Sequence, residues 1–201
     1  TRDDVIKQYG IERSKLKVIY NGVAQNSVEY SPDEMDQFKK YHHLERPYFL
    51  YLGAIHPRKN VVKLIEAFNQ FKAINGSDHM LVLAGRLAWN FEDVHRAVAA
   101  SAFKRDIRIL GYFEGNKDLL LKNAIALYYI SLFEGFGLPL LEAMRMGTPI
   151  IASHASALPE IGGDAAMYVA PNDVKEIADS MVEIVTNEGL RCDLVEKGYE
   201  R

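Results

Sequence analysis

The chain has 201 residues, of which 48% are hydrophobic and 25% charged, and its 24 basic and 27 acidic residues give a net charge of −3. This composition is typical of a globular domain, and the length suits a single α/β domain. A nucleic-acid-binding protein would more often carry a basic excess, and no apolar run approaches the roughly 18 residues of a membrane span. The single cysteine, Cys192, cannot form an internal disulfide, which favours a reducing, cytoplasmic setting.

Short runs of apolar, β-branched or aromatic residues predict six strands along the chain. In chain order they cover residues 17–20, 48–52, 80–84, 107–110, 125–130 and 149–153. Several of these runs are apolar throughout rather than alternating, which is typical of parallel strands that are covered on both faces.

Helical patterns lie between these strands. Apolar residues recur at steps of three and four from Val61 to Ile74 and again from Val174 to Val185, which predicts two amphipathic helices. Strand and helix in repeated alternation predict a Rossmann-like, doubly wound parallel sheet in one α/β domain. Further helices are expected at residues 1–9, 91–101, 117–123, 138–146 and 188–201, and the polar segment 26–45 is expected to be a loop with one short helix. The two end helices lack natural caps, so we expect the chain to be part of a longer protein.

A glycine-rich turn joins the predicted strand at 125–130 to the helix at 138–146. In open α/β sheets, ligands bind beyond the carboxyl ends of the strands. Gly135 and Gly137 allow the backbone to approach a ligand closely, and Pro139 suits a first helical turn. The N–H groups of that turn, with the helix dipole behind them, predict an anion site that suits a diphosphate.

Two acids flank this turn, Glu134 before it and Glu142 one helical turn beyond its end. Carboxylates accept hydrogen bonds from vicinal hydroxyls, so the pair suits a ligand with sugars on both sides of a phosphate. An alternative interpretation makes Glu134 a helix cap and leaves Glu142 solvated. The spacing alone favours that alternative, and the glycine-rich turn reverses the preference.

A second loop, residues 51–60, joins the strand at 48–52 to the next helix. Gly53 ends the strand, and Arg58 and Lys59 stand before the helix, where two cations can neutralise a leaving diphosphate. The alternative is a solvated basic pair, although cations at a helix start oppose the dipole. There is no Asp-x-Asp pair and no zinc-type spacing of His and Cys, so we expect no metal and no cofactor.

Taken together these motifs resemble glycosyltransferase family 4, the group 1 retaining enzymes of GT-B fold. The resemblance would make this chain the C-terminal, donor-binding domain, with residues 1–25 as the interdomain junction and residues 26–201 as the domain itself. The matching segments are Glu134 to Glu142 with Gly-Phe-Gly-Leu-Pro between them, residues 147–153, residues 158–166, residues 83–85, Gly53, Lys59 and residues 18–23.

The resemblance also implies roles for single residues. Arg58 and Lys59 match the basic residues that bind the donor diphosphate, and Glu142 matches the acid on the ribose. Glu134 matches the acid near the transferred sugar, where it would position the sugar rather than attack it. The backbone of Gly135, Phe136, Gly137 and Leu138 would contact phosphate and sugar, and Tyr112 would lie near the base. One departure is Ala54, where many members have arginine.

For the whole enzyme the resemblance implies retaining transfer of a hexose from a nucleoside-diphosphate sugar, with a lean towards GDP-mannose. The acceptor, a glycan or lipid-linked molecule, would bind an N-terminal domain that could associate with the inner face of the cell membrane. Two other classes stay open: a non-catalytic nucleotide-binding module, and a dinucleotide-binding oxidoreductase domain. Leu140 stands where the oxidoreductase fingerprint needs its third glycine. A GT-B epimerase is a further alternative, because fold alone does not set the reaction.

Overall fold

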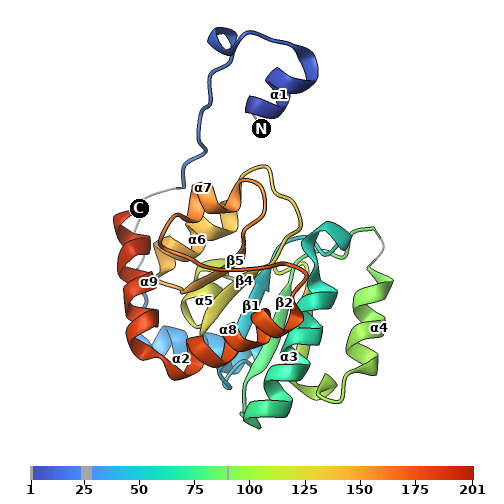
Figure 1. Cartoon of the computed structure of the whole chain (residues 1–201). Coiled ribbons are helices and arrows are strands. Elements are labelled where there is room, and N and C mark those ends of the chain that lie inside the picture. Colours follow the sequence, from blue (N-terminus) through green and yellow to red (C-terminus); the bar gives the residue numbers. More distant parts are fainter. Residues whose placement is uncertain (1, 24–28, 90) are drawn as a thin grey trace.

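A computed structural model describes residues 2–23, 29–89 and 91–201. In this part of the chain six parallel strands form one sheet in the order β3-β2-β1-β4-β5-β6 (Figure 1). The predicted doubly wound sheet is therefore confirmed. The strands are β1 (Tyr48–Leu52), β2 (Met80–Ala84), β3 (Ile107–Gly111), β4 (Ala126–Tyr129), β5 (Ile150–Ser153) and β6 (Met167–Val169).

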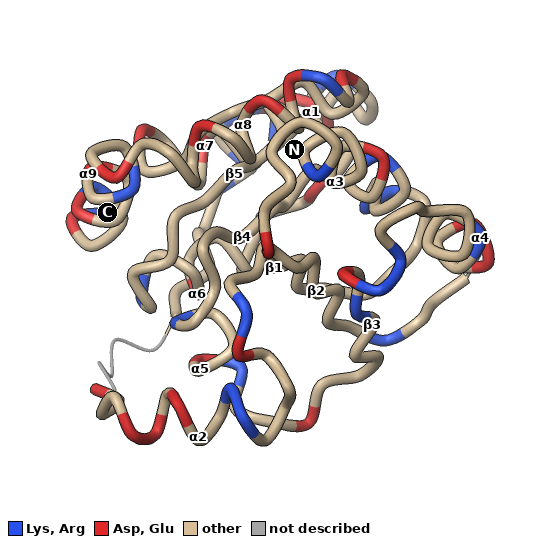
Figure 2. The backbone as a smooth tube through the Cα atoms, turned by 90° about the horizontal axis from the view of Figure 1, so that it is seen from below, with Lys and Arg blue, Asp and Glu red and all other residues tan. Residues whose placement is uncertain are grey.

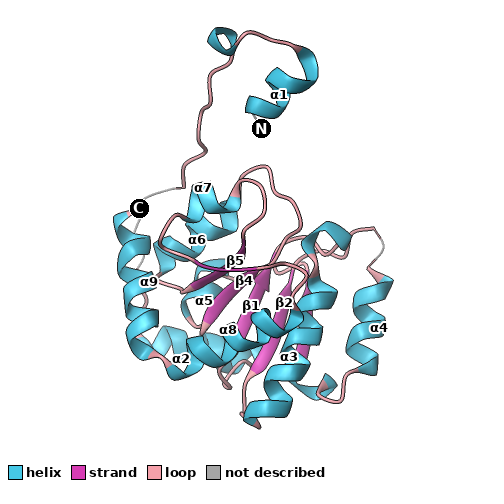
Figure 3. Cartoon of the chain, viewed as in Figure 1, coloured by secondary structure: helices cyan, strands magenta, loops and turns pink. Residues whose placement is uncertain are grey.

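Helices cover both faces of the sheet, so that the strands lie inside a three-layer body (Figure 3). One face packs against α2 (Pro32–His42), α5 (Lys117–Lys122), α6 (Leu138–Met146) and α7 (Leu158–Gly162). The other face packs against α3 (Val61–Asn75), α4 (Glu92–Ala100) and α8 (Val174–Thr186), and α9 (Glu188–Glu200) packs on α6 and α8. Three short 3-10 turns complete the order: η1 (Arg13–Lys15), η2 (Pro57–Lys59) and η3 (Lys104–Asp106).

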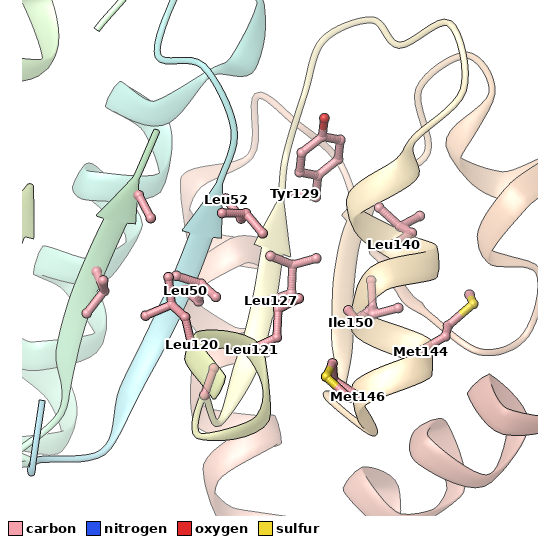
Figure 4. Packing of buried hydrophobic residues seen from close by; sticks show 14 of the residues in the cluster. Leu50, Leu52, Leu120, Leu121, Leu127, Tyr129, Leu140, Met144, Met146 and Ile150 are labelled. Carbon is pink, nitrogen blue, oxygen red and sulfur yellow. The ribbon is translucent and has the colours of Figure 1, made fainter. Parts of the chain in front are cut away.

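Burial on both faces explains why the strands read as continuous apolar runs. Successive side chains of a strand point to opposite faces. Along β1, Tyr48, Leu50 and Leu52 therefore enter one hydrophobic cluster, while Phe49 and Tyr51 enter the other. Each large side chain buried in this way contributes about 1.5–3 kcal/mol. Figure 4 shows the cluster on the α6 face, and Figure 2 shows that charged residues lie mostly on the helices and loops around the sheet.

Polar caps fix where several helices begin. Ser31 and Glu34 form a reciprocal capping box at the start of α2, and Asp173 accepts the Glu176 N–H at the start of α8. The helix α6 differs: its N-cap is Gly137, no side chain caps it, and Pro139 occupies its first turn. The backbone N–H groups in the first turn of α6 are thus available to a ligand.

The strand order places β1 beside β4 at the centre of the sheet. The chain leaves β1 for α3 on one face and leaves β4 for α6 on the other face. Two loops therefore diverge where the connections change direction, which opens a crevice at the carboxyl ends of the strands. Both motifs singled out in the sequence lie at this crevice.

Some sequence predictions were wrong. Residues 17–20 form no strand: Ile19 is 80% exposed, and the segment has no neighbouring strand with which to pair. The short strand β6, with three residues, and the short helix α7, with five, were not predicted. The polar segment 26–45 carries the expected helix, α2, and its residues 26–28 lie outside the described chain.

The amino-terminal segment stands apart from the layered body in Figure 1. Its helix α1 (Arg2–Tyr9) has no buried residue. The Tyr20 hydroxyl donates to Glu160 Oε1 over 2.5 Å, which links the segment to α7. The division into a junction and a domain stays a prediction. Among the described residues no helix has both the length and the apolar character needed to cross a membrane.

The sheet tolerates no side chain at Gly85, immediately after β2. A Cβ atom there would lie 1.8 Å from the Gly53 carbonyl oxygen, and the φ angle of Gly85 is +153°. We therefore predict that Gly85→Ala lowers the free energy of unfolding by about 3 kcal/mol, because it combines overpacking with backbone strain. Urea denaturation measures this loss. Gly22→Ala is the matched control, since a Cβ at Gly22 meets nothing within 4 Å, and equal stabilities of the two variants would contradict the prediction.

Candidate functional site

The loops after β1 and β4 contact each other directly. The Leu132 N–H donates to the Arg58 carbonyl over 2.8 Å, and Arg58 Nη1 donates to the Phe133 carbonyl over 2.7 Å. The cationic loop and the glycine-rich loop, which are more than 70 residues apart in sequence, therefore form one site.

Lys59 forms a buried ion pair with Glu134 at the centre of the site. Lys59 Nζ lies 2.5 Å from Glu134 Oε1, and each side chain is only 8% exposed. The second carboxylate oxygen, Oε2, lies 3.7 Å from Arg58 Nη1. Burial lowers the pKa of Lys59, while the hydrogen bond and the charge of Glu134 oppose that change. Two cations and one carboxylate leave a net charge of +1, which suits an incoming anion.

Tyr129, the last residue of β4, completes this cluster. Lys59 Nζ donates to the Tyr129 hydroxyl over 2.5 Å and lies 4.6 Å from the centre of its ring. Figure 4 shows Tyr129 above Leu127 and Leu140, with its hydroxyl directed away from the apolar cluster. Burial, then the charge of Glu134 and a hydrogen bond with it, raise the pKa of Tyr129 well beyond its usual range. The phenol therefore stays neutral.

A serine holds the backbone of Glu134 in place. Ser156 Oγ accepts the Glu134 N–H over 2.6 Å and donates to the Glu134 carbonyl over 2.8 Å. Ser156 itself has a φ of +52°, a conformation that non-glycine residues rarely adopt. Because Glu134 is bound in this way and the N-cap of α6 is Gly137, the alternative interpretation of Glu134 as a helix cap is wrong.

The amino end of α6 adjoins this cluster. Gly137 has a φ of +115°, and a Cβ there would lie 2.8 Å from Leu158 Cδ2, so only glycine fits the turn. A Cβ at Gly135 would meet no atom within 4 Å, which leaves space beside the backbone. Phe136 is partly buried against the core, and Leu138, the first residue of α6, is 41% exposed. A helix N-terminus with an open approach attracts anions.

Glu142 and Tyr112 lie at increasing distance from the centre of the site. Glu142 Oε1 lies 3.7 Å from Lys117 Nζ, and the charge of Glu142 contributes to the raised pKa of Tyr129. Tyr112 follows β3 and is 73% exposed. Since β2 separates β3 from β1, two strand spacings of about 5 Å lie between Tyr112 and the centre of the site.

Gly53 shapes the wall beside the cationic loop. Its N–H donates to the Ala84 carbonyl over 2.9 Å, and its own carbonyl abuts Gly85. The next residue, Ala54, where the resemblance would favour arginine, accepts a hydrogen bond from the Tyr51 hydroxyl through its carbonyl over 2.9 Å. The cationic character of this loop therefore comes from Arg58 and Lys59.

A cleft of about 780 Å³ opens beside Glu134. One wall is the glycine-rich loop with α7, and the other is the amino-terminal segment. Tyr20 and Phe136 approach each other across the cleft, with 6.2 Å between their ring centres. Aromatic rings and carboxylates in one cleft suit a carbohydrate, because hydroxyl groups bind the carboxylates and C–H faces pack on the rings.

Two residues of the site escaped the sequence analysis. Tyr129 lies in an apolar run that predicts a strand, where a tyrosine is usually a core or rim residue. Only its position at the carboxyl end of the strand indicated the site. Ser156 gave no signal, because its hydrogen bonds are to a residue 22 positions away in the sequence. Within residues 2–23, 29–89 and 91–201, no three side chains of the metal-binding types gather into a potential metal site.

Comparison with known proteins agrees with this geometry. The family described as "Glycosyl transferases group 1" matches residues 33–201. An O-antigen chain mannosyltransferase B of Escherichia coli is 32% identical over 94% of this chain and 53% of its own length. The O-antigen chain mannosyltransferase RfbU of Salmonella typhimurium is 30% identical over 87% of this chain and 45% of its own length. The chain thus spans about half the length of these relatives.

A solved structure shares this fold over nearly its whole length. The C-terminal domain of a group 1 glycosyl transferase, LpcC from Francisella tularensis, superposes with a TM-score of 0.73 at 23% identity. The superposition covers 89% of this chain and 95% of that one. The predicted family is therefore confirmed, and the fold matches that of this C-terminal domain.

The buried ion pair predicts strong energetic coupling between Lys59 and Glu134. Either Lys59→Met or Glu134→Gln leaves its partner buried without full compensation, whereas the double variant removes both charges. We expect a coupling free energy of about 2 kcal/mol in a double-mutant cycle measured by urea denaturation. The control cycle uses Lys63 and Glu66, a more exposed pair on α3, and should show no resolvable coupling. Additive effects of the Lys59 and Glu134 variants would show that the pair is not formed.

Proposed function

Since the chain belongs to the group 1 family of glycosyl transferases, we propose that its parent protein transfers a hexose from a nucleoside-diphosphate sugar to a glycan or lipid-linked acceptor. This chain binds the donor, and the acceptor binds the part of the protein that lies outside it. The observation that carries the proposal is the buried Lys59–Glu134 pair beside the amino end of α6.

The donor diphosphate binds between the amino end of α6 and the two cations. The helix start supplies N–H donors and a favourable dipole, and Arg58 and Lys59 supply charge. When the anomeric C–O bond breaks, negative charge grows on the diphosphate. Groups that are already fixed around that position stabilise the charge without reorganisation, so we propose that transfer needs no metal ion.

Glu134 positions the sugar and does not act as a nucleophile. Its carboxylate is already bound by Lys59 at 2.5 Å and faces Arg58 at 3.7 Å, which lowers its readiness to form a covalent bond. We propose that the acceptor hydroxyl attacks from the face that the diphosphate leaves and gives its proton to the departing phosphate. The configuration of the sugar is then retained without a covalent intermediate.

The donor is most simply GDP-mannose. Two relatives, which match 94% and 87% of this chain, are both named mannosyltransferases of O-antigen chains. Glu142 then binds the ribose, and Tyr112, on the outer side, contacts the base. We place the reaction in the cytoplasm, at the inner face of the cell membrane. The oxidoreductase alternative is not favoured, because the glycine-rich turn follows β4 rather than opening the first strand–helix unit.

Ligand-dependent thermal unfolding of this chain tests donor binding. GDP at about fivefold its Kd should stabilise the fold by about 1 kcal/mol, which raises Tm by about 2–4 °C for a chain of this size. UDP and ADP should give smaller shifts, and NAD should give none. A shift with NAD and none with any nucleoside diphosphate would overturn the assignment.

Substitution of Lys59 in the full-length protein tests its role in transfer. We expect Lys59→Ala to lower kcat by a factor of about 100 or more, because a charge that stabilises the departing diphosphate is lost. Lys63→Ala removes a cation one helical turn away, on α3, and should leave the rate unchanged. The measurement is mannose transfer from GDP-mannose, and near-normal turnover by Lys59→Ala would exclude this mechanism.

A further inference from the structure

We propose that Tyr129 is a positioning residue that orients the Lys59 ammonium towards the donor diphosphate; this inference rests on the function proposed above. The hydroxyl of Tyr129 lies 2.5 Å from Lys59 Nζ, at the carboxyl end of β4. The tyrosine is 2% exposed, so its ring is fixed by the core while its hydroxyl reaches the site.

A count of hydrogen-bond donors shows what Tyr129 does for Lys59. A lysine ammonium has three N–H donors and no acceptor. The structure uses one of them for the Tyr129 hydroxyl and one for Glu134 Oε1, each over 2.5 Å. With two directions fixed, the third N–H has a defined direction as well. That remaining donor is the one available to a phosphate oxygen.

The core holds Tyr129 firmly enough for this role. Its ring stacks on Tyr51 with 6.5 Å between ring centres and an angle of 14° between ring planes. Tyr51 is in turn fixed through the hydrogen bond from its hydroxyl to the Ala54 carbonyl. The Lys59 side chain reaches the same place from η2, on the neighbouring loop. Tyr129 therefore sets the position of the ammonium relative to the sheet, and the ammonium does not depend on the loop alone.

Glu134 alone would orient the ammonium less well. With a single carboxylate contact, the –NH₃⁺ group can rotate about that hydrogen bond. The ammonium and the carboxylate can also move together as one unit. The aromatic face adds a second restraint, because Lys59 Nζ lies 4.6 Å from the centre of the Tyr129 ring. Loss of the hydroxyl would remove the acceptor for Lys59 and the hydrogen bond with Glu134 and would keep the ring, so Tyr129→Phe separates the effect of the hydroxyl from that of the ring.

The hydroxyl also affects the range of pH in which Lys59 carries its charge. Burial lowers the pKa of Lys59, and an acceptor that favours the ammonium form works against that change. Tyr129→Phe removes one acceptor, so the pKa of Lys59 should fall further. Donor affinity requires the charged form and is lost as pH rises through that pKa, so the loss should begin at lower pH in the variant. The other titratable or charged groups around this cluster are Arg58, His56, Tyr51, Glu134 and Glu142.

The experiment measures GDP and UDP binding to the full-length protein by calorimetry from pH 7 to pH 10, together with kcat and KM for transfer. We expect Tyr129→Phe to weaken diphosphate binding about tenfold at pH 8, the effect of one lost hydrogen bond to a charged group. The alkaline loss of affinity should move down by about one pH unit. The melting temperature reports the fold separately.

Tyr128→Phe is the matched control. Tyr128 is the preceding residue of β4, is fully buried on the opposite face, and pairs its hydroxyl with Ser180 Oγ over 3.4 Å. Its loss should change stability and leave the pH dependence of binding untouched. Wild-type affinity and an unshifted pH profile in Tyr129→Phe would overturn the inference, and so would the same shift in Tyr128→Phe. If Lys59→Ala also binds and transfers normally, the proposed function fails with it; if only Tyr129→Phe behaves as wild type, the function stands.

Discussion

The Lys59 ammonium lies buried against the Glu134 carboxylate at the point where β1 and β4 run side by side, and the geometry of the whole site follows from this contact. Burial of a charge is costly unless a partner compensates it, so the two loops that carry these residues cannot separate freely. The hydrogen bonds between Arg58 and the Leu132–Phe133 backbone reinforce the same contact. The ion pair thereby fixes the cationic loop against the glycine-rich loop and leaves the amino end of α6 beside both.

The sheet topology makes this contact possible. Strands β1 and β4 are neighbours although two other strands separate them in sequence. This is because β2 and β3 lie on the side of β1 that faces away from β4. The crossovers then change direction between β1 and β4, and their loops diverge to opposite faces. An open α/β sheet offers one such crevice, and ligands bind there because backbone N–H groups and loop side chains converge on it. In this chain both sequence motifs lie in the loops that follow the two strands bordering it.

Much of this arrangement follows from the sequence. Parallel strands buried on both faces read as apolar runs, so β1 and β2 were predicted to the residue, and Pro139 with the glycines marked the start of α6. Contacts between residues that are distant in the sequence could not be predicted from it. The run at residues 17–20 has the composition of a strand but no partner strand, and composition does not report partners. Tyr129 looks like any core tyrosine until the lysine from another loop is placed beside it. Ser156 acts through hydroxyl hydrogen bonds to the Glu134 backbone, 22 residues away, and no residue pattern indicated that contact.

A buried ion pair is weak support for stability, because desolvation offsets much of the attraction between the charges. Its benefit here is that both charges are desolvated before a ligand binds. The Lys59 and Glu134 side chains are already buried, so under the proposed function a bound diphosphate meets a cation whose desolvation does not have to accompany each binding event. The surplus charge of Arg58, which is 42% exposed, remains to attract the anion from solvent. We therefore propose that the two cations have different roles: the exposed Arg58 favours encounter with the anion, and the buried Lys59, held by Glu134 and Tyr129, stabilises the charge that develops as the sugar departs.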